Sequence, residues 1–387
     1  MQTVTSIPGD GIGPSIMEAA RSMRSSSKPR IIKRILVIKL RALGDVIMAT
    51  PVLRNLRLAF PGAEIDFLTE PASAPIIGGH PTVHDVLVLD RNRLGQLSFW
   101  QRLAAQRDFV RTLRQRNYDL VLDLFGNPRS AILTRLSGAP MRVGYRFRVR
   151  QLAYNHIVEP RGDRVHEVEF NLDALRALGI PILTKALEIA SDSNAAAEIE
   201  RYWLDQNLHL SDIVIGLNPS GGWYTKRWPL HSFAELGDRL QTELSAKVLL
   251  LWGPGELENA QAIARLMHTK PIVAPPTDLP QLAALLARLD LLISNDSGPL
   301  HLAAAMSTPV IGIFGPTKPE LQGPWGEGHE VVLKTGLPCL GCNGVTCRIK
   351  THDCMQTLSV AEVYQAVLHL VQNLNRSAAT ATSPGMP

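Results

Sequence analysis

Acidic and basic side chains follow three strand-like segments of the chain, where a loop must lead into a helix. These residues are Asp45 after RILVIK (34–39), Lys226 and Arg227 after IVIGLNPS (213–220), and Asp296 at the end of LLISND (291–296). A carboxylate at such a turn can accept a proton, and basic side chains can neutralise phosphate oxygens. Two plainer interpretations stand beside these: Asp45 caps a helix, since aspartate is a favoured cap residue, and the basic pair lies in a solvated loop.

The segment SNDSGPLHLAAA (294–305) has the most specific local pattern. Its strand runs through Asp296, Ser297 and Gly298 into a helix. The free N–H groups and positive dipole of a helix start suit a diphosphate, and the Ser297 hydroxyl can donate a further hydrogen bond. His301 lies about one helical turn further and can share that face, although a single histidine there is more often structural.

Two glycines stand before the basic pair. In NPSGGWYTKRWP (218–229), Gly221 and Gly222 allow the backbone to approach a ligand closely. The segment 218–229 is therefore a second candidate for contact with an anionic ligand.

These residues need a scaffold that brings the ends of several strands together. Strand-like runs alternate with helical patterns from residue 34 to about 125, and the alternation restarts at residue 213 after a connection near 180–198. Such alternation predicts parallel sheets, whose ligands bind at the carboxyl ends of the strands. The sequence therefore predicts an α/β protein with two Rossmann-like, doubly wound domains that face a cleft.

The composition excludes several classes of protein. A length of 387 residues suggests about two domains, and 45% hydrophobic residues exclude wholesale disorder. No run approaches the ~18–20 apolar residues of a membrane-spanning helix. Four cysteines do not make a disulfide scaffold, which favours a reducing cytoplasm. The net charge of +5 permits anionic partners such as nucleotides, phosphorylated lipids or a membrane surface.

From about Ile35 to Val371 the chain resembles glycosyltransferase family nine, the lipopolysaccharide heptosyltransferases. The resemblance rests on five motifs in this order: RALGDVIMATPVL, HEVEFNLDALRALG, NPSGGWYTKRWP, NDSGPLHLAAA and FGPTKPE. It implies the GT-B fold, with an acceptor-binding domain over residues 31–185 and an ADP-sugar-binding domain with a C-terminal helix over 186–375. A flexible tail is expected over 376–387.

The resemblance also implies an activity. The expected enzyme is an inverting, metal-independent glycosyltransferase that needs no cofactor. It would move heptose from ADP-heptose to the inner core of lipopolysaccharide at the cytoplasmic face of the inner membrane, with no nucleic-acid partner. The sequence contains no D-x-D metal-binding motif. A family member with another nucleotide sugar or acceptor is the nearest alternative.

The resemblance assigns roles to individual residues. Asp45 matches the catalytic base, and Lys226 matches the lysine that contacts donor phosphate. Asp296, Ser297 and Gly298 match the loop around the diphosphate and sugar.

The resemblance does not assign the remaining donor contacts to single residues. Glu256 is near the position expected to meet the ribose, with Glu258 close enough to leave the register open. Some members have threonines where this chain has Gly221 and Gly222, so backbone N–H groups must replace those contacts.

Arginines of the first half are candidates for an anionic acceptor and for a lipid surface. The acceptor candidates are Arg91, Arg93, Arg142, Arg146 and Arg148. The helix expected at 102–116 carries Arg107, Arg111 and Arg114, which can rest on anionic lipid. A solvated basic face explains that helix equally well. For 142–150 we favour acceptor binding, because the segment falls in the acceptor domain.

A cysteine-rich segment precedes the last helix. Cys339, Cys342, Cys347 and Cys354 form C-x2-C-x4-C-x6-C, which is not the spacing of a standard zinc finger. Four thiolates this close can bind a structural zinc ion or an iron–sulfur cluster. Reduced, unmetallated thiols are the interpretation we favour.

The first 30 residues differ from the rest of the chain. IPGDGIGPSI (7–16) resembles the start of isocitrate and isopropylmalate dehydrogenases, but its glycines do not have the G-x-G-x-x-G spacing of a dinucleotide site. We therefore treat residues 1–30 as an extension and linker, and a dehydrogenase as the alternative from another class. A non-catalytic nucleotide-sugar-binding protein is a third, against which the presence of both Asp45 and Lys226 argues.

Overall fold

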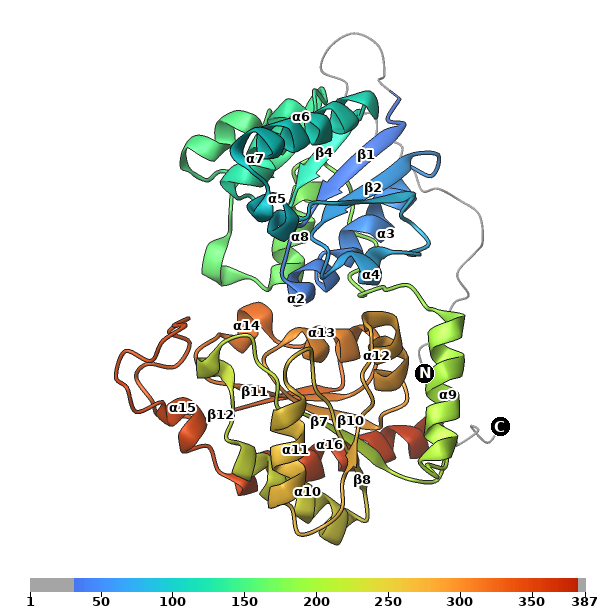
Figure 1. The fold of residues 1–387 in the computed structure, drawn as a ribbon, viewed down its shortest axis with the longest axis vertical. Helices are drawn as coiled ribbons and strands as arrows, with labels where there is room; N and C mark the ends of the chain where they lie inside the picture. The colour runs from blue at the N-terminus through green and yellow to red at the C-terminus, as the bar shows by residue number, and fades with distance from the viewer. Residues whose placement is uncertain (1–30, 382–387) are drawn as a thin grey trace, which may run out of the picture.

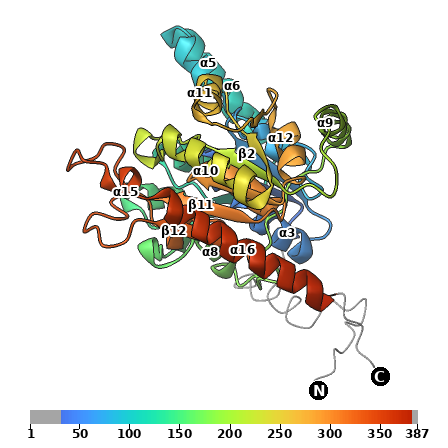
Figure 2. The same ribbon diagram turned by 90° about the horizontal axis from the view of Figure 1, so that it is seen from below.

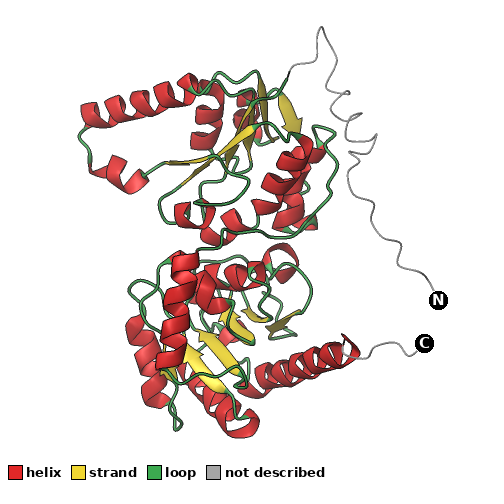
Figure 3. Cartoon of the chain, turned by 90° about the vertical axis from the view of Figure 1, so that its right-hand side faces the viewer, coloured by secondary structure: helices red, strands yellow, loops and turns green. Residues whose placement is uncertain are grey.

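The computed structural model describes residues 31–381, which form two lobes in succession (Figure 1). The predictions for residues 1–30 lie outside the described residues. Each lobe has one sheet between layers of helices, as Figure 3 also shows. None of the described helices combines the length and apolar character that crossing a membrane requires.

The first lobe contains six strands with their connecting helices. Its elements are β1 (Arg34–Ile38), α2 (Leu43–Ile47), α3 (Thr50–Ala59), β2 (Glu64–Thr69), α4 (Ala74–Ile77), β3 (Asp85–Val88), α5 (Arg91–Gln96), α6 (Phe99–Gln115), β4 (Leu120–Asp123), α7 (Pro128–Leu136), β5 (Met141–Tyr145), the 3-10 helix η1 (Arg148–Ala153), β6 (His156–Val158), η2 (Gly162–Arg164) and α8 (Glu167–Arg176).

The second lobe repeats this plan after the linking helix α9 (Ser193–Asp205). Its elements are β7 (Val214–Asn218), η3 (Tyr224–Lys226), α10 (Leu230–Leu244), β8 (Lys247–Leu250), α11 (Leu257–Leu266), β9 (Ile272–Val273), α12 (Leu279–Leu286), β10 (Leu291–Asn295), α13 (Gly298–Ala305), β11 (Val310–Phe314), α14 (Pro319–Gln322), β12 (His329–Leu333), α15 (Asp353–Gln356) and α16 (Val360–Ala381).

Both sheets have the doubly wound strand order. The orders are β3-β2-β1-β4-β5-β6 and β12-β11-β10-β7-β8-β9, and every pair is parallel. Counted within its own lobe, the second order is the same as the first. The order therefore reverses between β1 and β4, and again between β7 and β10. Ligands of such sheets bind at these switch points, and the predicted fold class is confirmed.

The central strands are apolar along almost their whole length because helices cover both faces of each sheet. Ile35 to Ile38 of β1 and the five residues of β7 are buried. Helix α3 packs with α8 on the first sheet, and α16 packs against α10, β11 and β12 on the second (Figure 2). This packing fixes the carboxyl ends of β1, β7 and β10.

The chain crosses between the lobes after α8. Helix α9, the next helix, packs on α12 of the second lobe. The predicted domain boundary at 185/186 falls in this crossing. Helix α16 continues to Ala381, past residue 375, where a tail was expected to begin.

Candidate functional site

The candidate residues of the two lobes lie at the carboxyl ends of the strands that flank the switch points. Lys39 and Asp45 follow β1, and Asp296 follows β10. Asn218 is the last residue of β7, and Lys226 lies in the loop after it. Helix α2 of the first lobe packs against α13 of the second, so these two groups of residues face each other (Figure 1).

Asp45 lies in the first turn of α2, and one of its oxygens closes the start of that helix. Its Oδ2 accepts a hydrogen bond from the Ala42 N–H at 2.9 Å, so capping is part of its role. Burial raises the pKa of the Asp45 carboxyl, and the charge of Glu167 raises it further, while Lys39 and Lys226 oppose the shift. A raised pKa gives a carboxylate the proton affinity that a general base needs.

Lys39 is a member of the site that the sequence analysis missed. Its buried Nζ donates to Glu167 Oε1 at 2.6 Å and to Asn171 Oδ1 at 3.1 Å. It also donates to the Leu124 carbonyl at 3.1 Å and so spans the switch point from β1 to β4. A lysine directly after a buried strand was the available signal, because lysine is almost never fully buried without a partner.

The contact between α2 and α13 is close because glycines stand on both sides of it. A Cβ at Gly44 would come within 2.4 Å of His301 Cδ2, and one at Gly298 within 2.8 Å of Leu43 Cδ2. Gly44 lies in helix α2 without a positive φ, so backbone conformation does not require a glycine there. The approach of His301 is the reason for this glycine.

His301 was predicted to contact the donor, and the structure places its ring between the lobes. The side chain is buried, and within the described residues its Nδ1 has no hydrogen-bond partner. Burial lowers the pKa of His301 to about 4, although Asp296 opposes this. The ring is therefore neutral at pH 7 and packs as an apolar group.

Lys226 and Asp296 form an ion pair at the carboxyl end of the second sheet. Lys226 Nζ lies 2.7 Å from Asp296 Oδ2 and 4.6 Å from the centre of the Trp223 ring. The same Asp296 oxygen accepts a hydrogen bond from Thr317 Oγ1 at 2.6 Å. The structure thus joins three of the motifs seen in the sequence: 218–229, 294–305 and FGPTKPE.

Ser297 stands at the start of α13 and is held by an amide from the neighbouring strand. Asn218 Nδ2 donates to Ser297 Oγ at 2.9 Å and to Ser294 Oγ at 2.8 Å. Ser297 Oγ in turn donates to the Asn295 carbonyl at 3.1 Å. The Ser297 side chain does not cap the first N–H groups of α13, which remain suited to an anion.

The structure separates Glu256 from Glu258. Glu256 accepts a hydrogen bond from Ser220 Oγ and lies 3.4 Å from Arg227, beside the 218–229 loop. Glu258 pairs with Arg265 on its own helix instead. Gly221 supplies a carbonyl to Arg227 Nε at 2.9 Å, and Gly222 borders open space. Of the two glutamates, Glu256 is therefore the one near the candidate donor loop.

The predicted acceptor arginines have different surroundings. Arg142 donates to the carbonyls of Ala139 and Ala153, and burial lowers the pKa of its guanidinium. It therefore braces the loop that it lies in. The other four are exposed, and two of them are paired: Arg91 with Glu70, and Arg146 with Glu159.

A cleft of about 450 Å³ opens between the two lobes. Phe147, Glu167 and Phe170 line it from the first lobe, and Thr317 and Lys318 from the second. Glu167 is the partner of Lys39, and Thr317 is the partner of Asp296. One residue of each charged network therefore borders the same cavity.

The cysteine segment reaches this cleft, and its sulfurs are not joined in disulfides. Cys342 lines the cavity together with Gly341 and Asn343. All four cysteines are free thiols. Over residues 31–381, no three or more His, Cys, Asp or Glu side chains are grouped in a way that would hold a metal ion. The zinc alternative stays a prediction.

Known proteins with similar sequences include lipopolysaccharide heptosyltransferases. Residues 106–352 match the family model "Glycosyltransferase family 9 (heptosyltransferase)". The chain is 31% identical to lipopolysaccharide heptosyltransferase 3 of Escherichia coli K12 over 293 residues, which cover 73% of this chain and 83% of that protein.

Two solved structures extend the similarity to the fold. A glycosyl transferase family 9 protein of Veillonella parvula matches 90% of this chain and 100% of its own, with a TM-score of 0.81 and 26% identity. The E. coli heptosyltransferase WaaC with ADP matches 87% of this chain and 99% of its own, with a TM-score of 0.69 and 26% identity.

Proposed function

The chain belongs to glycosyltransferase family 9, and from that premise we propose that it moves heptose from ADP-heptose to the inner core of lipopolysaccharide. It is a glycosyltransferase of GT-B fold. The donor is inferred from structures of E. coli WaaC with ADP and with ADP-2-deoxy-2-fluoro heptose. The acceptor is inferred from the name of the E. coli relative.

One observation carries the proposal: a half-buried carboxylate of one lobe faces an ion-paired lysine and a helix start of the other. Asp45 lies on α2, which packs on α13, and α13 begins next to Asp296 and its partner Lys226. A transferase needs a base on one substrate and positive charge on the leaving group of the other. The contact of α2 with α13 brings a candidate base and a candidate phosphate-binding lysine to the same part of the interface between the lobes.

The transfer is a single displacement with inversion. A carboxylate oxygen of Asp45 takes the proton of the acceptor hydroxyl, and the hydroxyl oxygen attacks the anomeric carbon of the heptose. The bond from that carbon to the diphosphate oxygen breaks, and ADP leaves with the electron pair. Lys226 and the N–H groups at the start of α13 stabilise the charge of the leaving diphosphate, so we propose a metal-independent reaction.

The donor and acceptor occupy different lobes in this proposal. The donor lies on residues 186–375, against Lys226, Asp296, Ser297, Gly298 and Glu256, with the backbone of Gly221 and Gly222 near its phosphates. The acceptor is a lipid-linked, anionic saccharide on residues 31–185. The exposed Arg93 and Arg148 are the acceptor arginines without a described ion pair, whereas Arg142 shapes the loop. The enzyme works at the cytoplasmic face of the inner membrane.

The test is a donor screen read by mass spectrometry. Purified full-length protein is mixed with deep-rough lipopolysaccharide and, separately, with ADP-heptose, other ADP-sugars and UDP-sugars. We expect the acceptor to gain the mass of a heptose residue from ADP-heptose alone, with one ADP released per transfer. Transfer from a different nucleotide sugar would replace the heptose assignment within the same family. Turnover of NADP with isocitrate or isopropylmalate would instead support the dehydrogenase alternative.

A further inference from the structure

Helices α5 and α6 project from the first lobe and leave large apolar side chains uncovered. Figure 2 shows the pair at the edge of the molecule. Of the 17 residues of α6, only Leu113 is buried. Phe99, Trp100 and Leu103 in its first two turns are 68%, 75% and 50% exposed. Adjacent exposed aromatic residues of this size mark a surface that binds something.

The exposed side chains of α6 form one stripe. Trp100, Leu103, Arg107, Arg111 and Arg114 recur at intervals of three and four residues, which places them on a single face of the helix. We call these five residues the α6 face. Its three arginines line one shallow hollow, and Arg107 and Arg111 form no ion pair with the described residues. The face is thus apolar at its start and cationic along the rest.

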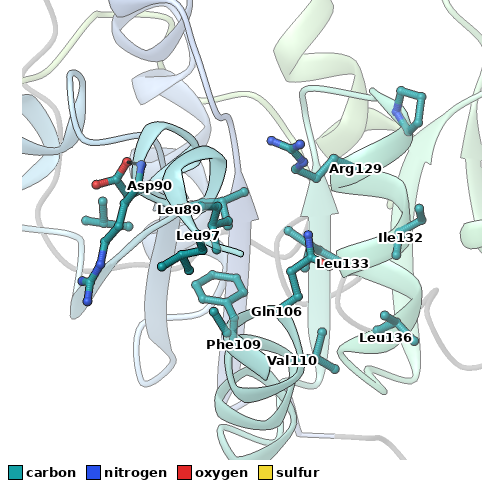
Figure 4. Close-up of a pocket in the computed structure, with 15 residues that line it drawn as sticks. Leu89, Asp90, Leu97, Gln106, Phe109, Val110, Arg129, Ile132, Leu133 and Leu136 are labelled. Atoms are coloured by element: carbon teal, nitrogen blue, oxygen red, sulfur yellow. Dashed lines mark hydrogen bonds between the residues drawn. The ribbon is translucent and has the colours of Figure 1, made fainter. Parts of the chain in front are cut away.

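An apolar groove lies beside this face. It has a volume of about 630 Å³ and runs between α6 and α7, next to the end of β3. Figure 4 shows Leu97 and Phe109 on one side of it, and Ile132, Leu133 and Leu136 on the other. Arg129 is a further cation among its lining residues. The apolar lining of the groove suits the acyl chain of an anionic lipid, and the basic residues suit its phosphate.

We propose that the α6 face and this groove are a docking site for an anionic phospholipid bilayer. Arg107, Arg111 and Arg114 contact lipid phosphates, Trp100 lies at the level of the headgroups, and one acyl chain enters the groove. Charge complementarity favours a bilayer over a protein surface, because α6 carries four arginines and one aspartate around its apolar start. The exposed Trp100 also fits a bilayer, because amphipathic aromatic rings concentrate at the headgroup level of membranes. This inference deepens the proposed location at the inner membrane and rests on it.

The docking site also lies beside the proposed acceptor loop. Helix α7, which forms one wall of the groove, packs against η1 of that loop. Val149 and Leu152 of η1 are 76% and 74% exposed, so this loop also carries uncovered apolar side chains. A bilayer on this side would present a lipid-linked acceptor near the loop 142–151.

The experiment is sedimentation of the full-length protein with vesicles, without donor or acceptor. One set is phosphatidylcholine alone, and the other contains phosphatidylglycerol at about one third of the lipid. We expect binding to the anionic vesicles only, weakened at high salt. Each arginine near an anionic surface contributes about 1 kcal/mol, so the triple variant R107Q/R111Q/R114Q should bind about 100-fold more weakly.

Two further variants test the apolar part, and two controls test specificity. Trp100→Ser removes the exposed aromatic side chain, and Ala105→Trp fills the groove; each should weaken binding about tenfold. Leu204→Ser on α9 and Arg265→Gln on α11 change exposed residues elsewhere and should bind as the unchanged protein does. Unchanged ADP affinity checks that each variant is folded.

The outcomes separate docking from catalysis. Equal binding to neutral vesicles, no binding to either set, or full binding by the triple variant would overturn the proposal. Full binding by the Ala105→Trp variant would remove the acyl chain from the groove, and self-association through the α6 face would make it a protein interface instead. A protein that binds anionic vesicles but transfers no heptose would refute the proposed activity and leave the docking site standing.

Discussion

The ring of His301 lies directly against Gly44, the residue that precedes Asp45. A methyl group at residue 44 would come within 2.4 Å of His301 Cδ2 and 3.1 Å of Nε2. The ring is buried and neutral, so it cannot swing into solvent without opening the contact between α2 and α13. This single contact ties the position of the proposed base to the lobe that holds the donor.

Gly44→Ala should therefore displace Asp45 without touching its chemistry. We expect a fall in kcat of up to about 100-fold, because a displacement of about 1 Å can misalign a general base. Gly95→Ala is the matched control, since a Cβ at Gly95 meets nothing within 4 Å. Adding His301→Ala to the Gly44→Ala variant makes room for the methyl group and should restore part of the rate. A double variant no faster than Gly44→Ala would show that the overlap is not the cause.

Asp45→Asn should remove the proton acceptor and keep the fold. The asparagine oxygen can still accept the hydrogen bond from the Ala42 N–H that closes α2. We expect transfer to fall by about 10²–10⁴-fold, the usual contribution of a general base, with ADP affinity nearly unchanged. Steady-state kinetics and calorimetric titration with ADP measure the two effects. A variant with near-normal turnover would exclude Asp45 as the base.

The raised pKa of Asp45 predicts an acid limb in the pH profile. The base must be deprotonated, so kcat should fall as pH drops through a pKa above the ordinary value for aspartate. Burial raises this pKa and Glu167 adds to the rise, so Glu167→Gln should move the limb to lower pH. Because the pKa of Asp45 is raised in the folded protein, the ionised carboxylate lowers the free energy of unfolding. Asp45→Asn should thus unfold at an equal or higher temperature at pH 8, and the difference should shrink as pH falls. An acid limb unmoved by Glu167→Gln would contradict this account.

The sequence was sufficient to predict the fold class because the buried strands are near-continuous apolar runs. RILVIK and LLISND correspond to β1 and β10 within one residue. The sequence analysis missed β5 and α7. The β5 sequence, MRVGY, is interrupted by an arginine and a glycine, and β5 is recognisable only from its pairing with β4 and β6. Helix α7 has no strong apolar periodicity, because it packs on both β4 and η1.

The sequence motifs identified Asp45, Lys226 and Asp296 as candidate site residues. They did not indicate which side chains form hydrogen bonds or ion pairs with one another. Lys39 was missed because its partners, Glu167 and Asn171, are 128 and 132 residues away along the chain. Glu256 and Glu258 are only two residues apart, so the sequence could not show which of them lies near the donor loop. Their partners, Ser220 and Arg265, distinguish the two glutamates in the structure. Long-range packing decides both cases.

Lys226→Ala should weaken donor binding and slow transfer together. The variant loses the cation nearest the proposed diphosphate and leaves Asp296, which is buried, without its ion pair. We expect kcat to fall about 10²–10³-fold, as when one electrostatic contact to a transition state is removed. Lys334→Ala is the control, since Lys334 also pairs with a carboxylate, Glu362, but away from the cleft. Unchanged rate and unchanged ADP affinity in the Lys226→Ala variant would exclude the lysine from the donor site.

The two neighbouring glutamates provide an internal comparison for the nucleoside end of the donor. Glu256 faces Ser220 and Arg227 on the loop after β7, whereas Glu258 pairs with Arg265 on the exposed side of α11. A carboxylate that accepts hydrogen bonds from ribose hydroxyls contributes about 1.5–3 kcal/mol, so Glu256→Gln should weaken ADP binding at least about tenfold. Glu258→Gln should leave ADP affinity unchanged, because its side chain lies away from the 218–229 loop. Isothermal titration of both variants with ADP and with adenine makes the comparison. If Glu256→Gln weakens the binding of ADP but not of adenine, Glu256 lies at the ribose or the phosphates. If it weakens the binding of both equally, Glu256 lies at the base. A fall in ADP affinity for Glu258→Gln, with none for Glu256→Gln, would reverse the assignment.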